Sequence, residues 1–278
     1  MCYENKQLLQ GECMTWIQVV VLAVVQGLTE FLPISSSGHL VLVPSVLGWT
    51  DQGLVFDVAV HFGSLGAVCI YFRNDIAALL RGSLGVATGD IASPESRMAM
   101  AIAIGTVPAA VAGLLFAGWI SDNLRHPSVV VATLAGYGIV LALADRFGKR
   151  LRIIADVRLS DAIVIGLAQA LALVPGTSRS GVTISAALML GFQRRDAARF
   201  SFLLSAPVIL LATLYEAAIL IFDGGGVSWD TLAVAALVSG VVAYLSIEFF
   251  MRFVTAIGLL PFAVYRLILA AVIVTVLL

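Results

Sequence analysis

Long apolar segments dominate this sequence and limit the folds that it can adopt. Of its 278 residues, 60% are hydrophobic and 12% are charged, whereas about a quarter of the residues in a typical soluble domain are charged. A helix that crosses a bilayer needs about 20 consecutive, mostly apolar residues. The sequence therefore predicts an all-α polytopic membrane protein that forms a single integral membrane domain over residues 1–278. Six segments are near the spanning length: Leu54–Phe72, Met98–Ile120, Ser128–Ala144, Phe200–Phe222, Thr231–Met251 and Leu259–Leu278.

The charge of the chain argues against a nucleic-acid partner. The formal net charge is −1, so we expect no strongly basic surface of the kind that binds phosphate backbones. The polar start, residues 1–15, lacks the basic beginning of a signal peptide. We interpret it as a loose tail rather than a cleaved leader.

Two further apolar stretches are interrupted by proline, glycine and serine, which oppose a continuous helix. Each piece is too short to cross a hydrocarbon core about 30 Å thick. Irregular backbone at that depth occurs only inside protein or beside a wet cavity, and broken helices often form binding sites. We therefore predict two re-entrant helix–loop–helix hairpins rather than two kinked spanning helices. The pieces are Trp16–Leu32 and Leu40–Leu47 around Pro33–His39, and Ala162–Val174 and Val182–Leu190 around Pro175–Gly181.

The two interrupted stretches match each other at one constant offset. Each half of the chain then holds one hairpin followed by three spans, over residues 16–145 and 160–278. Because three is odd, the second half should enter the membrane upside down, which makes an inverted-topology repeat. The matched pairs are Gln26 with Gln169, Ser35 with Ser178, Ser37 with Ser180, and Gly38 with Gly181.

The distribution of positive charge predicts the orientation. If Asp145–Ser160 is cytoplasmic, 12 of the 16 lysines and arginines lie on that side. Lys6 and Arg125 lie outside, and Arg179 and Arg266 lie within the membrane. By the positive-inside rule both termini then face outward. The first hairpin opens outward and the second opens toward the cytoplasm.

Charged and polar side chains at membrane depth are costly, so they are candidates for function. The first hairpin holds Gln26, Glu30 and His39, with the first two on one helix face because they are four residues apart. The second holds Arg179. If the loop tips meet, these side chains and several hydroxyls converge, and such a set suits phosphoryl transfer.

Each of these residue types has a role in that chemistry. Arg179 can hold two phosphate oxygens through its planar fork. Glu30 and Gln26 are hard oxygen ligands for Mg²⁺ or Ca²⁺. Ser36 is a candidate nucleophile and His39 a candidate base or leaving-group acid. The surrounding phosphate-binding candidates are the hydroxyls of Ser35, Ser37, Ser178 and Ser180.

Structural explanations compete with these roles. Glu30 and Arg179 also fit a buried ion pair that fixes the packing. The serines and His39 also fit a helix start. Asp57 and His61 are four residues apart, so we expect a local pair that supports the site. Arg266 fits either phosphate binding or a buried carboxylate partner equally well.

At these residues the sequence resembles the undecaprenyl-diphosphate phosphatase family, also called the bacitracin-resistance family. Three stretches over nearly the whole chain carry the resemblance: Gln26–His39, Pro175–Thr183 and Pro261–Arg266. The family pattern allows glutamate or glutamine at position 26, and this chain has the neutral residue, so its first motif has one carboxylate rather than two. The other family-type functional positions are present as Glu30, Ser36, His39, Ser178, Arg179 and Thr183.

The resemblance implies hydrolysis of a C55 isoprenyl diphosphate to the monophosphate and inorganic phosphate, with a divalent cation (Mg²⁺ or Ca²⁺). It implies a multi-pass protein of the bacterial cytoplasmic (inner) membrane, with its active site open to the outer face. It also implies recycling of the lipid carrier for peptidoglycan and tolerance to bacitracin. The main alternative is a transporter that flips undecaprenyl phosphate, because inverted repeats with broken helices are transporter architecture. The sequence does not fix the oligomeric state, and a homodimer is compatible with it.

Overall fold

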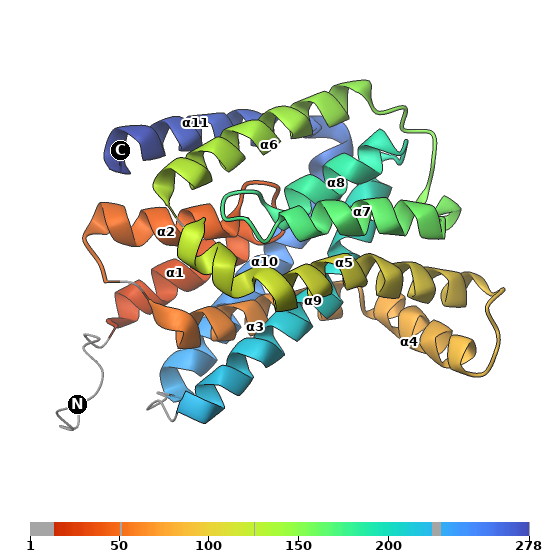
Figure 1. Cartoon of the computed structure of the whole chain (residues 1–278), viewed down its shortest axis with the longest axis horizontal. Helices are drawn as coiled ribbons and strands as arrows, with labels where there is room; N and C mark the ends of the chain where they lie inside the picture. Colours follow the sequence, from red (N-terminus) through yellow and green to blue (C-terminus); the bar gives the residue numbers. More distant parts are fainter. Residues whose placement is uncertain (1–13, 51, 125, 224–228, 278) are drawn as a thin grey trace.

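The computed structural model describes residues 14–50, 52–124, 126–223 and 229–277, and these fold into α-helices with no strand (Figure 1). Most of the predicted tail, residues 1–13, lies outside the described residues. The helices in chain order are α1 (Trp16–Thr29), α2 (Ser36–Leu47), α3 (Gly53–Tyr71), α4 (Arg73–Ala87), α5 (Pro94–Asn123), α6 (Pro127–Phe147), α7 (Leu159–Leu171), α8 (Arg179–Met189), α9 (Arg194–Asp223), α10 (Trp229–Ile257) and α11 (Leu260–Leu277), with a 3₁₀ turn at Ile154–Asp156.

Several helices have the length and composition of membrane spans. Within the described chain, α5, α6, α9 and α10 qualify alone, and α3 with α4 qualifies as one span bent by 87°. The apolar part of α11, Leu260–Val276, is shorter. The structure thus agrees with a multi-pass helical membrane protein, while the predicted number of six spans stays a prediction.

Helix α4 was not predicted from the sequence. Its first turns carry Arg73 and Asp75, so it does not form a long apolar run. It packs against α5 at glycines: a Cβ atom on Gly82 would lie 2.2 Å from the Glu95 carbonyl oxygen. The contact that stabilises α4 is therefore a close approach of two backbones, which composition alone does not reveal.

Both predicted helix–loop–helix units are present, but their second helices begin at Ser36 and Arg179, earlier than the predicted starts at Leu40 and Val182. Helices α1 and α2 flank the first loop (30–35), and α7 and α8 flank the second (172–178). Each loop ends on a serine with positive φ, 75° at Ser35 and 69° at Ser178. Such a conformation is costly for a residue with a side chain and persists only where its surroundings impose it.

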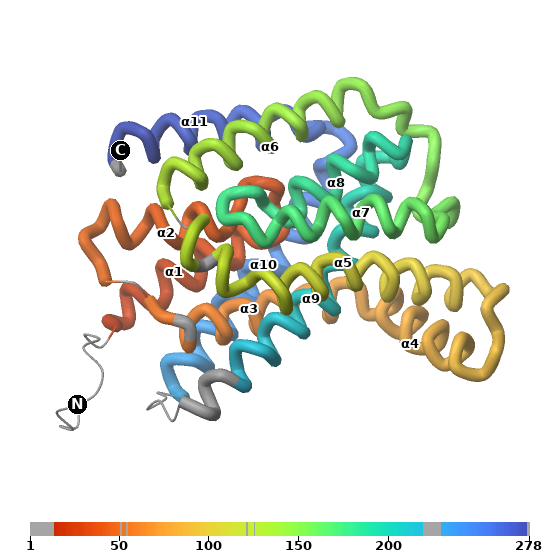
Figure 2. Tube along the Cα trace, viewed as in Figure 1, coloured from red at the N-terminus to blue at the C-terminus, as the bar shows by residue number. Residues whose placement is uncertain are grey.

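The two loops lie against each other near the middle of the molecule, as the tube in Figure 2 shows. The Gly176 backbone N–H donates to the Ser37 hydroxyl at 3.3 Å, and the Ser180 hydroxyl donates to the Leu32 carbonyl at 3.0 Å. The predicted meeting of the two loop tips is therefore confirmed by direct contacts.

Arg266 on α11 makes hydrogen bonds to both loops. Its side chain is fully buried and donates to five backbone carbonyl groups. These belong to Pro33 in the first loop, Gly176 and Thr177 in the second, and Thr133 and Leu134 in α6. The structure shows no carboxylate paired with Arg266 among the described residues, so of the two roles left open the carboxylate pair is wrong and phosphate binding stays a prediction. The guanidinium instead bonds the loop carbonyls of Pro33, Gly176 and Thr177, which lie outside regular helices, and ties them to the continuous helix α6.

Glycines let the central helices cross closely. A Cβ atom on Gly63 of α3 would lie 2.1 Å from the Ala236 carbonyl oxygen of α10. A Cβ atom on Gly166 of α7 would lie 2.4 Å from the Gly105 carbonyl oxygen of α5. Small residues at such crossings are typical of membrane helix packing, because lipid supplies no hydrophobic force between helices.

Replacing Gly63 with valine should therefore force α3 away from α10. We expect a loss of roughly 1–3 kcal/mol, as for other overpacked sites, measured as a lower midpoint of thermal unfolding in detergent. Gly66→Val is the matched control, because a Cβ atom on Gly66, one turn further along α3, would meet no atom within 4 Å. Equal midpoints for the two variants would contradict the crossing.

Arg266→Met should also destabilise the protein, because it keeps an apolar stem but removes the donor to the three loop carbonyls of Pro33, Gly176 and Thr177. Each unsatisfied group costs about 1–3 kcal/mol, so the unfolding midpoint should fall more than in Arg266→Lys, which retains some donors. Arg252→Met on α10 is the control, since Arg252 is exposed. A midpoint for Arg266→Met equal to that of Arg252→Met would disprove the role.

Candidate active site

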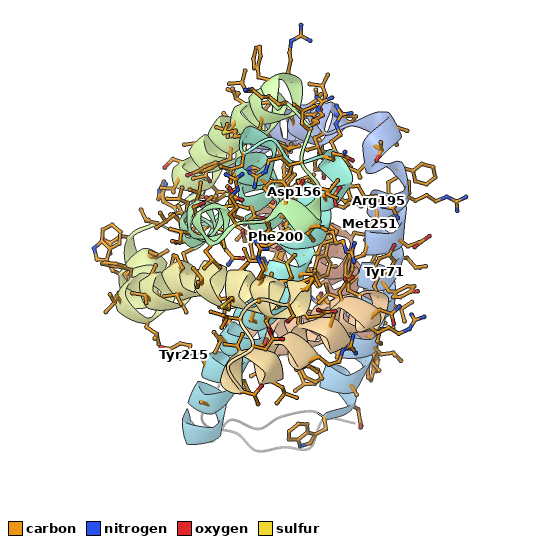
Figure 3. The ribbon with its side chains drawn as sticks, turned by 90° about the vertical axis from the view of Figure 1, so that its right-hand side faces the viewer. Tyr71, Asp156, Arg195, Phe200, Tyr215 and Met251 are labelled. Carbon is orange, nitrogen blue, oxygen red and sulfur yellow. The ribbon has the colours of Figure 1, made fainter. Side chains whose placement is uncertain are left out.

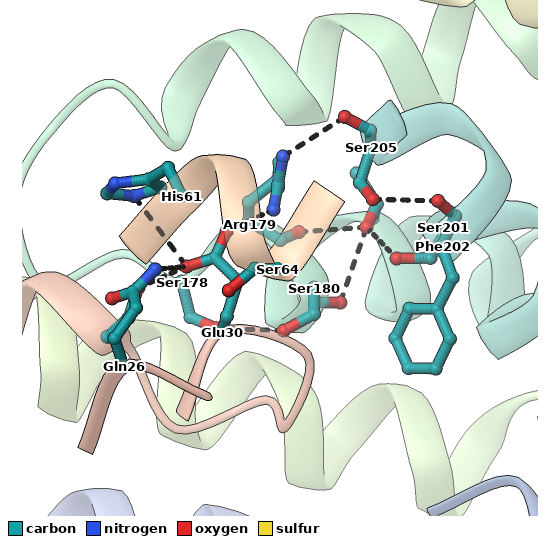
Figure 4. A network of polar contacts seen from close by, with 12 residues as sticks. Gln26, Glu30, His61, Ser64, Ser178, Arg179, Ser180, Ser201, Phe202 and Ser205 are labelled. Carbon is teal, nitrogen blue, oxygen red and sulfur yellow. Dashed lines mark hydrogen bonds and ion pairs between the residues drawn. The ribbon is translucent and has the colours of Figure 1, made fainter. Parts of the chain in front are cut away.

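Glu30 is the centre of a buried polar network between the two loops (Figure 4). Its Oε1 atom accepts a hydrogen bond from Nη2 of Arg179. Its Oε2 atom accepts from Nε2 of Gln26 at 2.9 Å and from the Ser36 hydroxyl at 2.8 Å. Nε2 of His61 lies 3.9 Å from the same oxygen.

These side chains come from four helices that the fold brings together. Gln26 is one turn before Glu30 at the end of α1, Ser36 begins α2, and His61 lies in α3. Arg179 begins α8 and also donates from Nη1 to the Ser205 carbonyl of α9 at 3.3 Å. The ion pair between Glu30 and Arg179 thus joins the two halves of the chain.

The other predicted hydroxyls make hydrogen bonds within and between the loops and the helix starts. Ser178 accepts from the Gly181 N–H at 3.2 Å and lies 3.3 Å from the Ser180 hydroxyl. Thr183 donates to the Arg179 carbonyl at 2.8 Å. Ser35 and Ser37 are 3.2 Å apart. Their phosphate-binding role stays a prediction, and Ser36 is the serine whose hydroxyl contacts the ion pair.

His39 lies behind the first loop. Its Nδ1 is 2.7 Å from the carbonyl oxygen of Ser35, and its Nε2 is 2.7 Å from the Tyr265 hydroxyl, with the two rings parallel. Both ring nitrogens are therefore engaged, and no hydrogen bond links His39 to Glu30, Ser36 or Arg179. In this arrangement His39 holds the strained Ser35, and its acid–base role stays a prediction.

His61 is the site residue that sequence reasoning underestimated. The local partner predicted for it was Asp57, and Nδ1 of His61 is indeed 2.7 Å from the carbonyl oxygen of Asp57. The other nitrogen faces Glu30, which is 31 residues earlier in the chain. Only the packing of α3 beside α1 creates that contact, so spacing along one helix could not indicate it.

An apolar wall lies beside this network. The ring of Phe31, next to Glu30, packs edge-on against Phe202, which also contacts Phe72 and Phe250. All four are almost completely buried. This wall keeps one side of the network dry, and charge interactions are stronger where water is excluded.

The network offers few donors to a metal ion. Within the described chain no group of three or more histidine, cysteine, aspartate or glutamate side chains could hold a metal ion. Glu30 and the amide oxygen of Gln26 remain, and that oxygen is buried without a hydrogen-bond partner. Such a pair fits Mg²⁺ or Ca²⁺ only when a ligand supplies most of the other oxygens, as phosphates commonly do for Mg²⁺.

The arrangement is suited to attack on an anionic phosphorus centre. A serine hydroxyl donates to a carboxylate, which can accept its proton. An arginine beside them can neutralise an anion with its planar fork. These are the parts that phosphoryl transfer requires.

Comparison with known proteins agrees with this chemistry. Residues 19–272 match the model of the family described as "Bacitracin resistance protein BacA". Three similar proteins named undecaprenyl-diphosphatase come from Hahella chejuensis, Chromohalobacter salexigens and Teredinibacter turnerae. They are 53%, 52% and 50% identical to this chain, over 93%, 93% and 92% of its length and 97%, 98% and 97% of theirs. The chain belongs to the bacitracin resistance protein BacA family.

Proposed function

We propose that this chain hydrolyses undecaprenyl diphosphate to undecaprenyl phosphate and inorganic phosphate. The observation that carries the proposal is the contact of the Ser36 hydroxyl and the Arg179 guanidinium with the two oxygens of one buried carboxylate, Glu30. The enzyme is thus a membrane hydrolase that regenerates the lipid carrier for cell-wall synthesis. Removing the diphosphate also removes the molecule that bacitracin sequesters, which accounts for resistance.

The reaction follows from the positions of three side chains. Arg179 turns one edge of its guanidinium to the terminal phosphate and neutralises its charge. Ser36 transfers its proton to Oε2 of Glu30 while its oxygen bonds to the terminal phosphorus, and the bond to the bridging oxygen breaks. Undecaprenyl phosphate leaves as an anion. Water then attacks the phosphoserine, Ser36 regains its proton from Glu30, and both protons of the water leave with inorganic phosphate as H₂PO₄⁻.

The proposed cofactor is a divalent cation, Mg²⁺ or Ca²⁺. Glu30 and the unpartnered amide oxygen of Gln26 would hold it, and when bound it supplies positive charge that offsets the diphosphate. With one carboxylate in the first motif, most of its ligands would come from the substrate.

The proposed architecture is the inverted repeat with six spans and two re-entrant hairpins. Three features support it. Ser35 and Ser178 occupy matched positions and share positive φ. Helix α1 packs on α10 as α7 packs on α5, each a first hairpin helix on a span of the other half. Helices α6 and α11, which close the two halves, pack on each other.

The proposed location is the bacterial cytoplasmic membrane, with both termini and the opening of the active site on the outer face. The start of α1 and the end of α11 lie at one end of the molecule, and residues 148–158 lie at the other (Figure 1). Figure 3 views that second end, where Asp156 and Arg195 are labelled. The arginines between 146 and 158 and those at 194 and 195 belong to this end, as the positive-inside rule requires for a cytoplasmic face.

Arg179→Ala should reduce phosphate release by about 100-fold or more, because losing one charge-stabilising group typically has that effect. The measurement is release of phosphate from a C55 or shorter isoprenyl diphosphate by purified protein in detergent, where a transporter without hydrolytic activity releases none. Arg199→Gln is the control, since Arg199 pairs with Asp75 away from the loops. A rate for Arg179→Ala equal to wild type would exclude Arg179 from the reaction.

Ser36→Ala should abolish the phosphoenzyme and nearly all turnover, because no covalent intermediate can form without the hydroxyl. Acid quenching with a substrate labelled in its terminal phosphate would detect phosphoserine in wild type alone. Ser45→Ala is the matched control, since its hydroxyl bonds only the Val41 carbonyl of the same helix, α2. Substantial turnover by Ser36→Ala would instead indicate direct attack by water.

A further inference from the structure

We propose that the protein has a second binding site, which holds the zwitterionic headgroup of a phospholipid of the phosphoethanolamine type. The site lies at the end of the molecule that contains residues 148–158, outside both loops. It is independent of the phosphatase reaction. In the proposed orientation it faces the cytoplasmic leaflet.

The first argument is the position of a cavity. An open cavity of about 790 Å³ lies where α3 ends, α9 begins and α10 ends. Helices α9 and α10 qualify as membrane spans, and α3 bends by 87° into α4 at the same place. The ends of spanning helices reach the level of the lipid headgroups. Figure 3 views this end and labels three lining residues, Tyr71, Arg195 and Met251.

The second argument is a set of donors in this cavity that have no partner. Arg195, Gln193 and Thr255 line the cavity and are exposed. Their side chains form no hydrogen bond or ion pair with the described residues. A guanidinium can donate two parallel N–H groups to one phosphate, and an amide and a hydroxyl can donate to its other oxygens. These three side chains therefore suit one phosphate group.

The third argument is the balance of charge in the cavity, which is lined by two arginines and two aspartates. Arg199 pairs with Asp75, which leaves Arg195 and Asp196. Oδ1 of Asp196 accepts from the Ile154 N–H at 3.0 Å, and its Oδ2 has no hydrogen-bond partner in the described chain. One guanidinium and one carboxylate oxygen thus remain for a ligand. A headgroup with both a phosphate and an ammonium group matches them, whereas a headgroup with phosphate alone leaves the carboxylate unpaired.

The fourth argument is an apolar surface next to the cavity. Tyr71 packs edge-on against Tyr244 of α10, with ring centroids 5.5 Å apart. Tyr244 and Leu245 are exposed and lie about two turns before Met251, toward the middle of the span. The Tyr71 hydroxyl hydrogen-bonds Glu248, so this nearby carboxylate is engaged as well. The acyl chains of a lipid held in the cavity would therefore lie along apolar side chains of α10.

Native mass spectrometry of the full-length protein would measure the affinity for phosphatidylethanolamine and for phosphatidylglycerol with the same acyl chains. Wild type should bind the ethanolamine lipid at least about threefold more tightly, because only its ammonium group can pair with Asp196. Arg195→Gln should weaken binding of both lipids about tenfold, since it removes the charged donors to phosphate. Asp196→Asn keeps the oxygen that accepts from Ile154 but loses the charge, so it should bind the two lipids equally.

Arg252→Gln is the matched control, since Arg252 is an exposed arginine near the same end of α10 that does not line the cavity, and it should keep both affinities. Equal binding of the two lipids by wild type, or wild-type affinities in Arg195→Gln, would overturn the proposal. Inorganic phosphate offers the same phosphate chemistry without a lipid. Displacement of phosphatidylethanolamine by an equal concentration of inorganic phosphate would show a site for a free anion instead.

Discussion

The structure depends on hydrogen bonds to the backbone N–H and C=O groups of two interrupted helices inside an apolar protein. Carbonyl and amide groups at such breaks find no water in a bilayer core, so each must bond within the protein. The guanidinium of Arg266 serves five carbonyls from both loops and α6. Serine hydroxyls and the ring of His39 make hydrogen bonds with other backbone groups of the loops. These hydrogen bonds also determine the active-site geometry, because they fix the points where Ser36 and Arg179 begin their helices.

Local sequence was sufficient to predict the elements that local chemistry determines. Proline, glycine and serine interrupt the two apolar runs, and the breaks occur there. Charge at membrane depth singled out Glu30 and Arg179 because burying either alone is expensive, and they do form a pair. They could be matched although they are far apart in the sequence, because each predicted hairpin contains a single side chain that is charged at neutral pH and the two have opposite charges.

Long-range packing explains what could not be predicted. His61 reaches Glu30 only because α3 lies beside α1, and the role of Arg266 requires knowing that α11 passes behind both loops. His39 was expected near the reacting group, yet Tyr265, far along the chain, engages one of its ring nitrogens. Helix α4 depends on a glycine contact with α5. Each of these outcomes was decided by which helices are neighbours, and no periodicity or spacing encodes that.

The matched halves of the chain contribute different chemistry to one centre. At the same offset that relates Ser35 to Ser178, Ser36 corresponds to Arg179, and Glu30 corresponds to Leu173. A single half paired with its own copy would therefore present two nucleophiles without a guanidinium, or two guanidinium groups without a base. Fusion of two copies in one polypeptide removes that restriction, because each copy can then change independently. Under the proposed repeat, division of labour between the two halves is thus a condition for an asymmetric catalyst to arise from a symmetric ancestor.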